Sequence, residues 1–146
     1  MTYDEREAFI ASLTAELRRR LDGPHGDEHT ASAADLAAET VRYLNHATGV
    51  HVAAGVNYPG TVYAVTAGLS LTAGRMPQLC GQLTGWLNAA LGAGYLGVDN
   101  GSDPAGPVAE AVADLAVAAT LAARLSGVLA GVQSALGSVN ARGNQS

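Results

Sequence analysis

The segment from Pro107 to about Val139 constrains the fold more than any other part of the chain. Its apolar residues recur every three or four positions, which is the spacing that predicts an α-helix. One apolar line runs through Val108, Val112, Leu115, Ala119 and Ala122, and a second, on a rotated face, runs through Val117, Leu121, Leu125, Val128, Val132, Leu136 and Val139. Because a helix that is apolar on more than one side needs cover on each, we expect it to lie between other helices or against a partner.

Formal charges are concentrated in the first third of the chain. Residues 1–42 hold nine acids and five arginines, whereas residues 43–146 hold four acids and three arginines. A segment so poor in charge needs cover from its own core, from a copy of itself or from lipid. We therefore expect a homo-oligomer or a complex with a protein partner, with membrane association as an alternative.

Five helices are predicted from the apolar spacing and from the residues that begin and end helices. They cover residues 2–21, 32–48, 60–73, 77–91 and 107–139. Pro59 and Pro77 are placed to begin helices, and Gly49 and Gly74 are placed to end them. Residues 50–59 have no partner strand in the sequence, so we expect them to form a loop.

These elements predict an all-α fold, a single-domain bundle of about five helices with a long C-terminal helix. A chain of 146 residues is long enough to bury one core. Within residues 1–146, we expect charged N-terminal helices over 1–42, a charge-poor helical core over 43–139 and a frayed tail over 140–146.

The fourth predicted helix carries a continuous apolar stripe. It runs through Leu79, Leu83, Trp86, Leu87, Ala90 and Leu91. We expect Trp86 to anchor the core. Gly81 and Gly85, like Gly127 and Gly131, have the GxxxG spacing that lets two helix backbones approach closely. Close packing inside a soluble bundle is the expected use of these glycines, and membrane dimerisation is the alternative. Trp86 and the four glycines are therefore the candidate interaction residues.

The charge-free stretch from Met76 to Val98 is 23 residues, long enough to cross a bilayer. Its glutamines, asparagine and five glycines are instead typical of a buried helix in a soluble protein. The lone Cys80, on the apolar fourth helix, is expected to be a small core residue, and it excludes an internal disulfide. The acidic start of the chain does not resemble a secretory leader, so we expect a cytoplasmic protein, with membrane association as the alternative.

The loop of residues 23–30 has the densest set of potential metal ligands. The candidates are His25, Asp27, Glu28 and His29, with His46 and His51 near the end of the second predicted helix. Imidazole and carboxylate groups at this spacing are able to bind a divalent metal. The chain has no second zinc-type pair and no HExxH order, and short polar loops beside glycine and proline are usually solvated turns. We therefore expect no metal or other cofactor.

Catalytic and nucleic-acid signatures are absent from the sequence. It contains no GxSxG elbow, no P-loop and no CxxC pair, so no catalytic residue is predicted. The basic run from Arg18 to Arg20 ends a predicted helix, where positive charge is favourable, and its surroundings are acidic. A helix-turn-helix over the third and fourth predicted helices is disfavoured because residues 77–91 hold no charged group to contact phosphates.

Two stretches have a distinctive amino-acid composition, AADLAAETVRYLNHAT at 33–48 and RMPQLCGQLTGWLNAALGAG at 75–94. They are rich in alanine, glycine and leucine, and arginine is their only basic residue apart from histidine. In this style and in size, the chain resembles small accessory proteins of actinobacterial mobile elements, of the plasmid-spread class found near conjugative-plasmid transfer genes. The resemblance implies a non-enzymatic helper in DNA transfer that works through protein or membrane contacts. It carries no functional residue across.

The leading hypothesis is a non-enzymatic helical interaction or assembly protein that self-associates. A membrane-associated accessory protein is the first alternative. A small metal-dependent protein or enzyme using the histidine-rich loop is the second.

Overall fold

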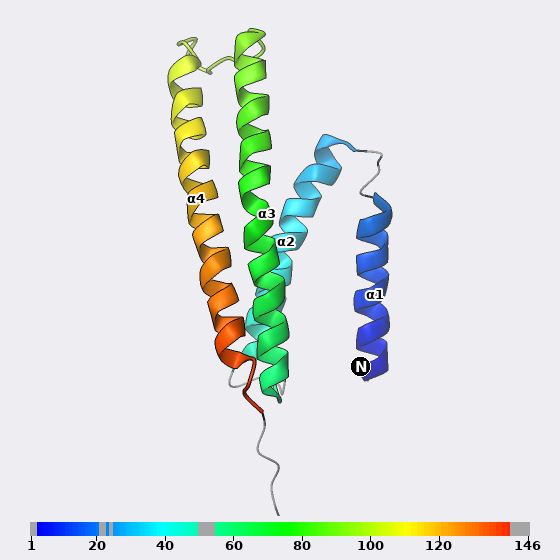
Figure 1. Cartoon of the computed structure of the whole chain (residues 1–146). Coiled ribbons are helices and arrows are strands. Elements are labelled where there is room, and N and C mark those ends of the chain that lie inside the picture. Colours follow the sequence, from blue (N-terminus) through cyan, green and yellow to red (C-terminus); the bar gives the residue numbers. More distant parts are fainter. Residues whose placement is uncertain (1–2, 21–22, 24, 50–54, 141–146) are drawn as a thin grey trace, which may run out of the picture. The chain divides into compact units, whose positions relative to one another are not determined.

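The computed structural model describes residues 3–20, 23, 25–49 and 55–140, and these residues contain four helices and no strand. The helices are α1 (Tyr3–Arg20), α2 (Asp27–Thr48), α3 (Pro59–Gly92) and α4 (Ala105–Leu136) (Figure 1). The chain divides into two compact units, Met1–Gly55 with α1 and α2, and Val56–Ser146 with α3 and α4. The all-α prediction is confirmed, while the predicted number of five helices is wrong by one.

The difference arises at residues 74–77, where two predicted helices are one continuous helix, α3. Gly74 is not among the described glycines with positive φ, so it does not end a helix in the left-handed conformation. Pro77 lies inside the helix. It lacks an N–H, so the bond to the carbonyl of Ala73 is lost, and the packing of α3 against α4 holds the helix together across this gap.

Helix α2 begins five residues earlier than predicted, at Asp27, after an extended Gly26. Asp27 and Glu28 lie in its first turn, where the positive end of the helix dipole favours carboxylates. Gly49 ends α2 as predicted, but with a φ of −66° and not in the left-handed conformation. No residue of α2 is buried, so the buried face predicted for this helix is not formed within the described unit.

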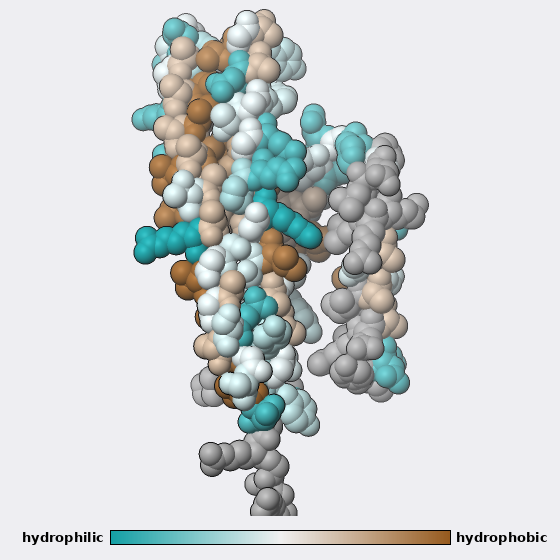
Figure 2. Space-filling model, viewed as in Figure 1, coloured by the Kyte–Doolittle hydropathy of each residue, from teal (hydrophilic) through white to brown (hydrophobic). Residues whose placement is uncertain are grey.

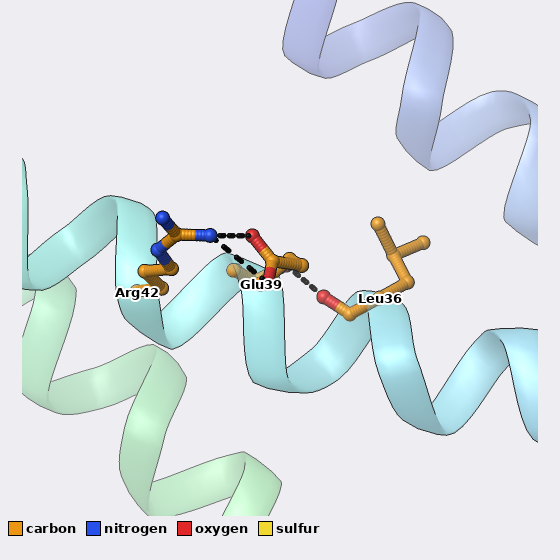
Figure 3. A network of polar contacts seen from close by, with 4 residues as sticks. Leu36, Glu39 and Arg42 are labelled. Carbon is orange, nitrogen blue, oxygen red and sulfur yellow. Dashed lines mark hydrogen bonds and ion pairs between the residues drawn. The ribbon is translucent and has the colours of Figure 1, made fainter.

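An ion pair on the surface of α2 joins two side chains that are one helical turn apart. Arg42 Nη1 lies 3.3 Å from Glu39 Oε2, and Thr40 Oγ1 donates to the carbonyl of Leu36 at 2.8 Å (Figure 3). Both charged side chains are mostly exposed. An exposed pair at this spacing adds at most about 0.5 kcal/mol to helix stability, so it supports α2 without marking a site.

Helices α3 and α4 lie side by side and antiparallel, joined by residues 93–104 (Figure 1). The connector turns at Gly94 and Gly101, whose φ values of 68° and 74° suit glycine. Asp103 Oδ1 accepts the N–H of Ala105 at 2.9 Å. Helix α4 begins at Ala105, two residues before the predicted Pro107. Within its unit, α4 packs against α3.

Candidate interaction surface

The contact between α3 and α4 follows one line of residues on each helix. On α3 the line is Ser70, Ala73, Pro77, Cys80, Thr84, Leu87 and Leu91; on α4 it is Val108, Val112, Leu115, Ala119, Ala122, Ser126, Leu129, Gln133 and Leu136. Every one of these residues is buried or half-buried, and the steps alternate between three and four. This is the heptad spacing by which two helices stay in contact along their length.

Two serines link the helices where the contact line begins on α3. Ser70 Oγ donates to the carbonyl of Ser126 at 2.9 Å, and Ser126 Oγ donates to the carbonyl of Ser70 at the same distance. A Cβ placed on Gly74 would lie 3.1 Å from Ser126 Oγ, closer than side chains usually approach. Glycine at position 74 therefore allows the two backbones to approach here, and the reciprocal bonds fix their register.

The buried residues of the hairpin are small, and most of its large apolar residues are outside. Its most buried positions are Ser70, Ala73, Cys80, Ala90, Val108 and Ala122, which confirms Cys80 as a small core residue. The contrast between neighbours is sharp, since Ala122 is 5% exposed and Leu121 is 59% exposed. No described side chain is fully buried, so the hairpin does not enclose a core of its own.

Eight large exposed side chains form what we call the apolar face. They are Met76, Leu79, Leu83 and Trp86 on α3, with Leu121, Leu125, Val128 and Val132 on α4. Each directly precedes a residue of the contact line. Two antiparallel helices are related by a two-fold axis perpendicular to the plane that contains both of them, and rotation about this axis leaves each face of the pair where it is. Residues that directly precede a contact-line residue therefore lie on the same face of the pair on both helices. Figure 2 shows hydrophobic side chains exposed along the hairpin.

Most of the second apolar line predicted on α4 forms an exposed stripe, while its residue Leu136 lies on the contact line with α3. The first line lies against α3, as expected for a helix with a partner on one side. The second line remains in water, with Val128 60% exposed. The predicted cover of the second line, by other helices of the chain or by a partner, stays a prediction.

Trp86 is not a core anchor, because 58% of it is exposed. The sequence stripe around it mixes two faces, with Leu87 and Leu91 half-buried on the contact line and Trp86 beside them on the apolar face. The helical period alone did not separate two adjacent lines that both carry apolar residues.

The four GxxxG glycines lie away from the α3–α4 contact. A Cβ added at Gly81, Gly85, Gly127 or Gly131 would meet no atom within 4 Å. Gly81, Gly85 and Gly127 each follow a contact residue, which places them on the side opposite the apolar face. Their predicted use in packing within the bundle is not realised in the described chain, and a role in contact with another chain stays a prediction.

Sequence reasoning missed the residues that hold the hairpin together. Ser70 and Ser126 were not singled out, and Gly74 was interpreted as a helix end. The signal was present in the heptad spacing of small residues that begins at Ser70. The predicted break at residues 74–77 divides this heptad pattern between two helices, so the pattern is not recognised as one line.

The candidate metal ligands do not gather into a site. No group of three or more His, Cys, Asp or Glu side chains able to hold a metal occurs in the described part of the chain. His29 lies in the first turns of α2 and His46 in its last turn, so about 26 Å of helix separates them. His25, Asp27 and Glu28 are exposed, and His51 lies outside the described residues.

One described helix, α4, is long and apolar enough to cross a membrane, although only a small share of it is buried in this chain. Residues 76–98, the charge-free stretch that is long enough in sequence to cross a bilayer, do not form one continuous helix. The stretch ends in the connector beyond α3, whose last residue is Gly92.

No protein-family model, curated protein or solved structure matches this chain.

Proposed function

We propose that this protein is a non-enzymatic helical interaction or assembly protein whose contact surface is the apolar face of the α3–α4 hairpin. The observation that carries the proposal is that the most buried positions between the helices hold mostly small side chains, while eight large apolar side chains beside them are exposed. A contiguous exposed apolar patch on a soluble chain is typical of a surface that another molecule covers.

A protein surface fits this face better than lipid does. Every stretch of about 20 residues within α4, the length that crosses a bilayer, contains Arg124. Its charge costs about 3 kcal/mol near the bilayer centre. Arg75, on α3, lies beside Gly74, which meets Ser126, so both exposed arginines lie near one level of the hairpin. A hairpin inserted in lipid would bury two charges together, whereas a partner protein leaves them in water.

Site-specific photocrosslinking in cells tests the proposal. A photoreactive residue at Leu121, on the apolar face, should form protein adducts. The same residue at Ala123, exposed on the other side, is the matched control. Equal crosslinking at both positions, or none at Leu121, would overturn the proposal.

Membrane association is the second candidate, and the length and composition of α4 favour it. It predicts phospholipid adducts in place of protein adducts at Leu121. It also predicts that the chain sediments with membranes after extraction with high salt.

The style of the sequence supports placing this role in plasmid transfer or spread in an actinobacterium. That proposal predicts that deletion of the gene lowers the spread of a conjugative plasmid between compartments of the recipient. It also predicts that a variant with polar residues on the apolar face fails to restore spread.

A further inference from the structure

We propose that Asn100, in the connector between α3 and α4, is a site of spontaneous modification, at which the side-chain amide is converted to a carboxylate through a cyclic succinimide. The site lies outside the apolar face, and the proposal does not depend on what covers that face.

The residues around Asn100 leave the reaction free of steric hindrance. Asn100 is followed by Gly101, which has no side chain to crowd an approach to its backbone nitrogen. Asn100, Gly101 and Ser102 are all exposed, and a Cβ placed on Gly101 would meet no atom within 4 Å. The connector therefore leaves room for the side chain of Asn100 to fold back on the main chain and for water to reach it.

A turn in the connector holds the side chain of Asn100 against the backbone that follows it. The N–H of Ser102 donates to Asn100 Oδ1 at 3.0 Å. This bond closes an Asx turn around the peptide group between Asn100 and Gly101, so the side-chain carbonyl carbon lies near the nitrogen of Gly101. The same N–H stabilises the negative charge that develops on Oδ1 when a nucleophile attacks that carbon.

One other bond of the turn must open before the reaction. The N–H of Gly101 donates to the carbonyl of Val98 at 2.8 Å. Because Gly101 is exposed, this bond can open locally while the helices stay folded. Asn45 and Asn88 differ from Asn100, since the N–H that follows each of them lies inside α2 or α3 and belongs to a helical hydrogen-bond ladder.

The reaction consumes water and releases ammonia. After hydroxide removes its proton, the nitrogen of Gly101 attacks Cγ of Asn100, and the new C–N bond closes a five-membered ring. The side-chain nitrogen leaves as ammonia, with a proton taken from water. Water then adds to one of the two ring carbonyls and breaks its bond to the nitrogen. One cleavage leaves aspartate in a normal main chain, and the other leaves isoaspartate, in which the main chain runs through the former side chain.

Either product changes the connector. A carboxylate at position 100 directly follows Asp99 and adds a negative charge to a segment that also carries Asp103. Isoaspartate also adds one carbon to the main chain, so the bond from Gly101 to Val98 cannot keep its present geometry. The connector therefore converts, as the molecule ages, from one form to a second that is more acidic.

Mass spectrometry of the full chain, incubated at neutral and mildly alkaline pH, tests the proposal. Peptides that contain Asn100 should gain the mass difference between NH₂ and OH, in two forms of equal mass, while those that contain Asn45 or Asn88 stay unchanged. Because the amide must lose a proton before it attacks, the rate should rise about tenfold for each pH unit.

Hydroxylamine, which opens a succinimide, gives a second readout. It should cut the wild-type chain after residue 100. It should leave Asn100→Gln whole, because the longer side chain closes a six-membered ring less readily. Since residue 100 is exposed, the helix content of this variant should equal that of the wild type.

Incubation in urea separates the effect of the fold from that of the sequence. If Asn100 is converted in urea but stays unmodified in the folded chain, the turn protects it and the proposal is overturned. Equal rates at Asn100 and Asn88 in the folded chain would also overturn it, because conversion would then not depend on the exposed connector.

Discussion

At the scale of single residues, Ser126 has the most specific role in the hairpin, since its hydroxyl donates to a carbonyl of the other helix. Ser126→Ala removes that bond and should lower the free energy of unfolding by about 1 kcal/mol, the usual net value of such a bond. Ser134→Ala is the control, because Ser134 Oγ donates to Ala130 of its own exposed helix at 3.2 Å. Urea titration measures both. Equal losses would show that the link between helices adds nothing beyond an ordinary helix bond.

Two glycines of α3 distinguish the effect of helix propensity on stability from the effect of the close approach between α3 and α4. Gly81→Ala should raise the free energy of unfolding by about 0.5 to 1 kcal/mol, because alanine favours the helix and its Cβ would meet open space. Gly74→Ala should raise the free energy of unfolding by clearly less than Gly81→Ala does, or should lower it, because the added Cβ would lie 3.1 Å from Ser126 Oγ. Denaturant midpoints compare the two variants. The same gain at both positions would contradict the close approach at Gly74.

At the scale of elements, the continuity of α3 through Pro77 is the feature that sequence reasoning did not predict. Pro77→Ala restores one backbone bond within the helix and should raise the free energy of unfolding by about 1 kcal/mol or more. Amide exchange gives a second measure, since the new N–H at residue 77 should be protected together with its neighbours. An unprotected N–H there, without a gain in stability, would indicate two helices separated by a turn.

Helix α4 shows how far an apolar period predicts structure. Its existence, its approximate ends and both of its apolar lines follow from the spacing of valine and leucine. The spacing does not say which line faces α3, because both have the same period. In the structure the line that contains Ala119, Ala122 and Ser126 faces α3, and Leu121 and Leu125 stay exposed beside it.

At the scale of the whole molecule, the division of charge between residues 1–42 and 43–146 predicts that the second part needs cover. The hairpin carries an exposed apolar face, and what covers this face stays a prediction. The candidate site was found only in part. Trp86 belongs to the apolar face rather than to a core, and Gly81, Gly85 and Gly127 lie on the other side. A single sequence cannot reveal the occupant of such a face, because the occupant is another molecule.

Photocrosslinking from Leu121 tests most directly that another protein covers the apolar face. The account predicts protein adducts from a photoreactive residue at Leu121, and fewer from the same residue at Ala123, which is exposed on the other side of the hairpin. The Leu79→Ser and Leu125→Ser double variant should lower the yield of adducts from position 121. Equal yields at the two positions, or none at Leu121, would contradict the account.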